Sequence, residues 1–163
     1  MVRPPDGRLT WDPSALAGAL RGLVEDVSEY CTDGRRFSFI VERRIARDIL
    51  HGSLAPSEGA SFDVIDPQGR KWEVRSITRS GVYFCPSYMV GSSRSFEERG
   101  FLQKLDEIEG YVLADLTCFP DIPFWYVTAA TVLRWWNEQR LGTTTKIIRR
   151  RALALIHSLG VTQ

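Results

Sequence analysis

The segment from Phe62 to Thr78 constrains the fold more than any other part of the chain, because it has the pattern of a β-hairpin. Residues 61–65 are largely apolar, and residues 71–78 alternate between polar and apolar, which predicts two strands. Between them, Asp66-Pro67-Gln68-Gly69 suits a type I turn, which favours Asp first, Pro second and Gly fourth. An antiparallel strand pair is therefore predicted near the middle of the chain.

Two acids flank this turn, and the register of the hairpin decides whether they meet. With a loop of odd length, Ile65 pairs with Lys71. Asp63 then lies directly across from Glu73, and both carboxylates are within reach of one ion. In a two-residue hairpin, Asp63 would face Trp72 and Glu73 would point to the other side of the sheet. We expect the odd loop, or a bulge with the same effect.

Composition describes an ordinary globular chain. Its 163 residues are enough for a substantial core, and we expect one domain over residues 1–163. No apolar run reaches membrane-spanning length and no apolar signal segment opens the chain, so a cytoplasmic location is the default expectation. Three widely spaced cysteines favour buried thiols over a disulfide frame or a zinc site. The net charge of +1 gives no overall basic footprint for nucleic-acid binding.

Apolar periodicity and turn residues predict the other elements. We expect helices over about 13–30, 36–50, 95–109, 129–140 and 145–159, and strands over 61–65, 71–78, 81–85, 111–119 and 124–128. Residues 1–11 read as a loose leader and residues 52–60 as a loop. The order is helix, three strands, helix and strand, with helical additions over 13–30 and 129–159. It predicts an α/β fold, a three-layer mixed sheet flanked by helices.

The hairpin carries residues suited to phosphate chemistry. Two carboxylates from adjacent strands suit Mg²⁺, a hard ion that prefers oxygen ligands and keeps waters that a phosphate can replace. The carbonyl of Val74 is a candidate third ligand. Arg75 leaves the same face of the strand as Glu73, so its cation could stabilise negative charge on a phosphate. On the preceding helix, Glu42 and Asp48 could each reach such a site or pair with a neighbouring arginine at the surface.

This pattern resembles the PD-(D/E)XK nuclease superfamily, and the short chain is similar to its small type II restriction endonucleases. Asp63, a nine-residue gap and Glu73-Val74-Arg75 look like the family motif. The family's α-β-β-β-α-β core matches the predicted order over about residues 36–119. The resemblance implies that Asp63 and Glu73 bind Mg²⁺. It also places Arg75 in the position of the family lysine and Glu42 in that of an extra acid. The implied activity is sequence-specific hydrolysis of phosphodiester bonds in double-stranded DNA.

Arg75 departs from the family motif and leaves two alternatives open. Arginine keeps its charge and cannot act as a base, whereas a buried lysine can shift its pKa. Arg75 could fill an electrostatic role, but a need for proton transfer would leave the site slow or inactive unless Lys71 supplies an amine. The alternative to an active nuclease is a nuclease-fold module that binds DNA or a partner without cutting. An unrelated α/β interaction protein is a third reading.

Residues 78–95 follow the hairpin and form a candidate DNA-binding segment, since hydroxyls and arginines contact phosphates and base edges. The candidates are Arg79, Tyr83, Ser87, Tyr88, Ser92, Ser93 and Arg94. An ordinary loop packed by its tyrosines explains the same composition equally well. Cutting both strands of a palindrome takes two sites, so we expect a homodimer that uses the N-terminal helix or the last two helices. The resemblance also implies a companion DNA methyltransferase in the same system.

Overall fold

The computed structural model describes residues 2–57 and 59–161. Four residues lie outside the described part of the chain: Met1, Glu58, Thr162 and Gln163. They belong to the predicted leader, the predicted 52–60 loop and the ends of the predicted 1–163 domain. The described chain is a mixed α/β fold built on a six-stranded sheet of order β1-β7-β6-β4-β3-β2. Its strands are β1 (Gly7–Thr10), β2 (Ser53–Leu54), β3 (Val64–Ile65), β4 (Lys71–Ile77), β6 (Gly110–Asp115) and β7 (Asp121–Thr128).

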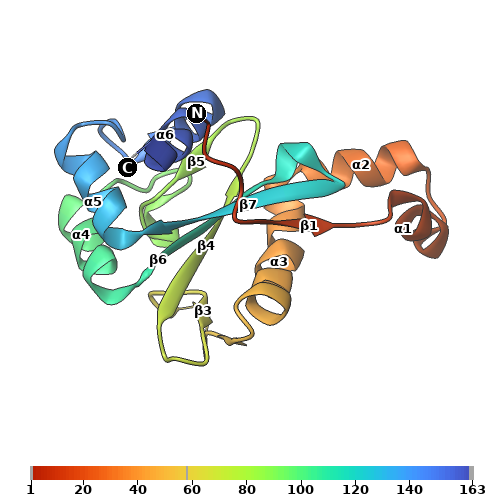
Figure 1. Cartoon of the computed structure of the whole chain (residues 1–163), viewed down its shortest axis with the longest axis horizontal. Helices are drawn as coiled ribbons and strands as arrows, with labels where there is room; N and C mark the ends of the chain where they lie inside the picture. Colours follow the sequence, from red (N-terminus) through yellow and green to blue (C-terminus); the bar gives the residue numbers. More distant parts are fainter. Residues whose placement is uncertain (1, 58, 162–163) are drawn as a thin grey trace.

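Helices cover both faces of this sheet (Figure 1). Its central strand β6 is therefore buried on both sides. Tyr111 and Leu113 belong to one apolar core, which packs under α4 (Glu98–Glu107), α5 (Ala129–Asn137) and α6 (Arg149–Ser158). Val112 and Ala114 belong to the other core, under α2 (Val24–Thr32) and α3 (Gly34–Arg44). β4 and β6 run parallel, whereas the other neighbouring pairs of the sheet are antiparallel.

The central hairpin has the predicted odd register, because Ile65 pairs with Lys71. The N–H of Gly69 donates to the carbonyl of Asp66 over 2.9 Å and closes the turn. Gly69 has a φ of 79°, a conformation that glycine adopts without steric cost. The buried Asp66 carboxylate accepts a hydrogen bond from the Trp72 indole N–H over 3.0 Å. The loop is therefore held by its backbone and by its first side chain.

The N-terminal region differs from its prediction in two ways. The loose leader over residues 1–11 is wrong, because residues 7–10 form β1, which pairs with β7 at the edge of the sheet. This strand is short and buries one side chain, Leu9, so it carries little apolar pattern. The single helix over residues 13–30 is also wrong. Arg21 adopts a left-handed φ of 53° and separates α1 (Pro13–Leu20) from α2.

The third predicted strand, over residues 81–85, does not join the main sheet. β5 (Val82–Tyr83) pairs instead with β8 (Lys146–Ile147) in a separate two-stranded sheet. Thr78 and Gly81 exchange backbone hydrogen bonds of 3.0 Å, and Gly81 has a φ of 110°, so the chain turns back sharply after β4. One edge of β4 therefore remains unpaired beyond Trp72, where its pairing with β3 ends.

The loop predicted over 52–60 is wrong at Ser53–Leu54, because these two residues form β2 and pair with β3. The remaining predicted elements lie near their expected positions, with shifted ends. Asp115 stops the strand predicted over 111–119, because its side chain accepts from the Thr117 N–H and caps a 3-10 turn. The helix predicted over 145–159 begins at Arg149, because β8 occupies residues 146–147. The helix predicted over 36–50 is α3 followed by a π-helical turn, Ile45–Ile49. Among the described residues, no helix combines the length and apolarity that crossing a membrane requires.

Candidate functional site

The open edge of β4 is the centre of the candidate site. Successive side chains of a strand point to opposite faces, and Val74 packs into the apolar core under α3. Glu73 and Arg75 consequently leave the other face of the sheet, the face covered by α4. Because β3 ends opposite Trp72, the edge of β4 beside Val74 is not covered by a neighbouring strand among the described residues.

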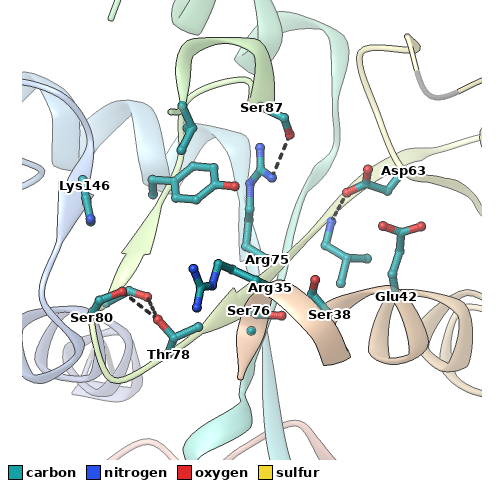
Figure 2. A pocket seen from close by; sticks show the side chains of 15 residues that line it. Arg35, Ser38, Glu42, Asp63, Arg75, Ser76, Thr78, Ser80, Ser87 and Lys146 are labelled. Atoms are coloured by element: carbon teal, nitrogen blue, oxygen red, sulfur yellow. Dashed lines mark hydrogen bonds between the residues drawn. The ribbon is translucent and has the colours of Figure 1, made fainter. Parts of the chain in front are cut away.

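Asp63 lies at this edge, directly before β3. Its N–H donates to the Trp72 carbonyl over 3.0 Å, and its carboxylate accepts from the Val74 N–H over 2.8 Å (Figure 2). In a strand, the N–H and C=O of one residue point to the same side. The Val74 carbonyl therefore faces the open edge beside Asp63, as its predicted role as a ligand requires.

Glu73 is buried between two cations. Only 2% of the residue is exposed, and Arg75 Nη2 lies 2.6 Å from its Oε1. Nζ of Lys104, on α4, lies 2.6 Å from Oε2, a close ion contact without hydrogen-bond alignment. Two cations and one acid thus share a buried volume, where removing one partner would leave charge uncompensated.

Lys104 is a residue that the sequence reasoning missed. It falls inside the apolar stripe of its helix, three residues after Phe101 and beside Leu105, so a lysine at a core-facing position was the available signal. Burial lowers the pKa of Lys104, Glu73 opposes this shift, and Arg75 adds to it. Lys71, the sequence candidate for an amine, is exposed and lies 5.1 Å from the Phe62 ring centroid. The buried amine of the site is therefore Lys104.

Two adjoining cavities follow the open edge of β4. The first, which we call the groove, has a volume of about 390 Å³ and contains Glu42 and Asp63 in its lining. The second, the side cavity, has a volume of about 280 Å³ and is lined by Asp63, Glu73 and Lys104 among others. Asp63 and Ser87 belong to both linings. The predicted acids are thus brought together, with Asp63 between Glu42 on one side and Glu73 on the other.

Burial, and to a smaller extent the neighbouring acids, raise the pKa of Asp63 and Glu42. Burial raises the pKa of Asp63 to about 6, and the Glu73 carboxylate adds to the shift, while the Val74 N–H opposes it. Burial raises the pKa of Glu42 to about 7, with Asp63 adding to the shift and Arg43 opposing it. Neighbouring carboxylates disfavour one another's charged forms, and a bound cation would reverse that effect.

The donor atoms fit a hard divalent cation. Within the described residues, no three His, Cys, Asp or Glu side chains cluster closely enough to hold a metal by themselves. Mg²⁺ needs fewer, because it commonly binds one or two carboxylates and completes its shell with water and phosphate oxygens. Asp63 with the Val74 carbonyl, and Glu42 or Glu73 beside them, supply oxygen donors of this kind at one place.

Arg75 is held rigidly over the site. Nη1 donates to Ser87 Oγ over 3.1 Å and Nη2 to the Cys85 carbonyl over 2.9 Å. The guanidinium also lies 4.6 Å from the centroid of the Tyr83 ring. Its Nε is buried without a hydrogen-bond partner in the described structure. Two of the predicted DNA-binding residues, Tyr83 and Ser87, thus position Arg75 and line the groove.

The other predicted DNA-binding residues are dispersed. Tyr88 is exposed and lines the side cavity. Arg94 donates to the carbonyls of Ser87 and Val90, each over 3.3 Å, and so fastens its own loop. Ser92 and Ser93 are exposed on that loop and line neither cavity. Arg79 does not line the groove but lines a third cavity beside α2 and α3, which shares Gly34, Arg35, Thr78 and Ser80 with the groove lining.

Asp48, the other acid considered on the helix before the hairpin, lies outside the site. Its carboxylate accepts from Arg44 over 2.8 Å and from Arg47 over 3.0 Å, and it lines neither the groove nor the side cavity. Asp48 therefore has the surface ion pairs that the sequence allowed as one alternative.

Comparison with known proteins adds no family to this description. No protein-family model, no curated protein and no solved structure matches the chain. The functional interpretation therefore rests on the sequence and on the geometry of the groove.

Proposed function

We propose that this protein is a divalent-metal-dependent endonuclease of the PD-(D/E)XK type that hydrolyses phosphodiester bonds in double-stranded DNA. The observation that carries the proposal is the meeting of Asp63, Glu73 and Arg75 at the open edge of β4. Acids that can share a cation, next to a fixed guanidinium and in a cavity, are the parts that phosphodiester hydrolysis needs. The restriction-endonuclease-like core and the type II assignment belong to this proposal and rest on the sequence resemblance.

Asp63, Glu73 and the Val74 carbonyl would hold Mg²⁺, with Glu42 as a further acid. When bound, the ion would lower the pKa of a coordinated water and offset charge on the phosphate. Arg75 and Lys104 orient the Glu73 carboxylate through their ion contacts. Arg75 lines the groove, and its positive charge would stabilise a phosphate oxygen that gains charge in the transition state.

Lys104 supports an active site despite the arginine in the motif, because it brings a second cation to Glu73. The Arg75 guanidinium keeps its proton, so it stabilises charge and does not act as a base. Lys104 reaches the same carboxylate from α4 and lines the side cavity together with Glu73. The site therefore has a permanent cation at one contact of Glu73 and an amine at the other.

Two strands of DNA require two such sites, which is the reason to propose a twofold homodimer. Leu20, Leu23 and Val24 are exposed at the junction of α1 and α2, at the end of the molecule away from α4 and α5 (Figure 1). Sedimentation analysis should give a dimer that Leu23→Asp weakens. A wild-type monomer at micromolar concentration, with or without DNA, would contradict this arrangement. A companion DNA methyltransferase is part of the same proposal.

Plasmid cleavage tests the activity. The purified protein should cut supercoiled DNA in Mg²⁺ or Mn²⁺ but not in EDTA, and Asp63→Ala should abolish cutting. Asp48→Asn is a matched control, because it removes an acid whose partners are Arg44 and Arg47 at the surface. Cutting that survives Asp63→Ala would overturn the proposed site.

A non-cutting DNA-binding module is the second candidate function. Arg75 in the motif and the engagement of both Glu73 oxygens by cations favour it. In that case the wild-type protein binds DNA without cleavage in either metal, and Arg75→Lys gains activity.

A further inference from the structure

The groove has two ends of opposite charge. Glu42 and Asp63 lie at one end, and Arg35 and Lys146 lie at the other, with Arg75 between them (Figure 2). The acids depend on a bound cation before they can accept an anionic ligand. The basic end does not, so it can attract a phosphate directly.

Elements from distant parts of the chain form this basic end. Arg35 belongs to the first turn of α3, and Lys146 belongs to β8. β8 reaches the groove because it pairs with β5, the strand that turns away from the main sheet after β4. Because β5 leaves its predicted place and pairs with β8, Lys146 lies beside the candidate site, although it comes shortly before the C-terminal helix in the sequence.

The approach of α3 to β4 at this end is close. A Cβ atom on Gly34 would lie 2.3 Å from Cγ2 of Thr78, so a larger residue would force the helix and strand apart. The Thr78 hydroxyl donates to the Gly81 carbonyl over 3.1 Å and lies 3.0 Å from Ser80 Oγ. Because Thr78 has one hydroxyl proton, the groove hydroxyls that can donate to a ligand are those of Ser80, Ser38 and Ser76. Hydroxyls of this kind donate to phosphate oxygens.

Among the described residues, neither cation makes a strong internal contact. The nearest acid to Arg35 is Asp33, with 3.6 Å between Nε and Oδ1, and the arginine side chain is 91% exposed. An ion pair in such a solvated position contributes little, so it would yield readily to a phosphate. Lys146 is also exposed. Further along the groove, the buried Nε of Arg75 has no partner among the described residues.

We propose that Arg35 and Lys146, with the Ser80 hydroxyl, form a binding subsite for the backbone phosphate that neighbours the scissile one. The inference rests on the proposed function, because it takes the acidic end as the position of the scissile phosphate. A nucleic-acid strand carries its phosphates in series. A strand seated at Asp63 and running along the groove must present its next phosphate towards the basic end.

Binding of a fluorescently labelled DNA duplex tests the subsite without requiring cleavage. Anisotropy titrations at several salt concentrations, with Ca²⁺ in place of Mg²⁺, would compare wild type with Arg35→Ala and Lys146→Ala. Each substitution should weaken binding roughly tenfold and reduce the salt slope by about 1. Arg150→Ala is the matched control, because Arg150 is an exposed cation of α6 that does not line the groove. It should change affinity less than about twofold.

The outcomes separate this inference from the proposed function. Equal losses in Arg150→Ala and the two groove variants, unchanged affinity in the groove variants, or no DNA binding by wild type would each overturn the subsite. A protein that binds with the expected pattern but never cuts plasmid DNA keeps the subsite and loses the nuclease proposal. If cleavage depends on Asp63 but the two groove variants bind DNA as tightly as wild type, the nuclease proposal stands and the subsite is overturned. Circular dichroism would verify that each variant is folded.

Discussion

Two buried acids on the parallel strands β4 and β6 show how differently one sheet can use a carboxylate. Asp115, at the end of β6, is 1% exposed and fully hydrogen-bonded: Arg149 donates from Nε and Nη2 over 3.0 and 2.6 Å, and Thr117 donates twice. Glu73, on β4, is 2% exposed but has ion contacts to Arg75 and Lys104 without hydrogen-bond alignment at Oε2.

The surroundings of the two acids explain the difference. Asp115 caps a 3-10 turn and anchors α6, so its bonds complete a structural unit. Glu73 faces a cavity that also contains Asp63, and its two cations exceed what one carboxylate needs. A buried acid with complete hydrogen bonds supports the fold. A buried acid that lies beside a cavity, with more positive charge around it than it needs, indicates a place where a ligand can bind.

The largest effect that this comparison predicts is a loss of activity without a loss of stability. Asp63→Asn should lower cleavage on the order of 10²- to 10³-fold, because it removes a charged metal ligand. It should leave the melting temperature unchanged or raise it, since burial and Glu73 disfavour the charged form of Asp63. Calorimetry beside a cleavage assay measures both. Destabilisation with full activity per folded molecule would make Asp63 a structural acid like Asp115.

The next effect concerns Lys104 and should reduce activity roughly 10²-fold. Lys104→Met keeps an unbranched side chain in a position that is 6% exposed but removes the amine beside Glu73. Lys104→Arg restores charge alone, so recovery of cleavage by arginine would assign an electrostatic role. Failure of arginine to rescue a folded variant would assign proton transfer. Full activity of Lys104→Met would remove Lys104 from the site.

A smaller effect is expected at the structural acid. Asp115→Asn should lower the free energy of unfolding by about 2 kcal/mol, less than for a fully buried pair because the Arg149 side chain is 36% exposed. Cleavage per folded molecule should not change. Urea denaturation and an assay well below the melting temperature measure the two quantities. A loss of activity at unchanged stability would erase the distinction between Asp115 and Glu73.

The smallest effect is on acid stability at the hairpin turn. Burial opposes ionisation of Asp66, but hydrogen bonds from Trp72, Arg70 and Gln68 outweigh it and hold its pKa at about 2. Because an unfolded aspartate titrates near 3.9, the charged group stabilises the fold above that pH and loses its contribution as the pH falls towards 2. Asp66→Asn should lower the melting temperature by roughly a few degrees at neutral pH. A difference that persists unchanged down to pH 2 would contradict this linkage.

Much of the site could be predicted because its information is local. The turn residues from Asp66 to Gly69 and the alternation after Lys71 determine the register, and the register brings Asp63 to the edge beside Glu73. Glu42 was predicted as an acid of the preceding helix that could reach the site, and it does line the groove. Lys104 was missed because its place in an apolar stripe signals burial but does not identify its partner, and its contact with Glu73 joins α4 to β4.

The sequence by itself determined the hairpin, the order of the central elements and the acids of the candidate site, because neighbouring residues set turn type and side-chain periodicity. Only the tertiary structure decided that residues 7–10 are a strand, that β5 leaves the sheet to pair with β8, and that Lys104 and Lys146 approach β4. Such contacts join segments far apart in the chain. Their stability comes from packing and strand pairing between two segments, so the sequence of either segment alone does not predict them.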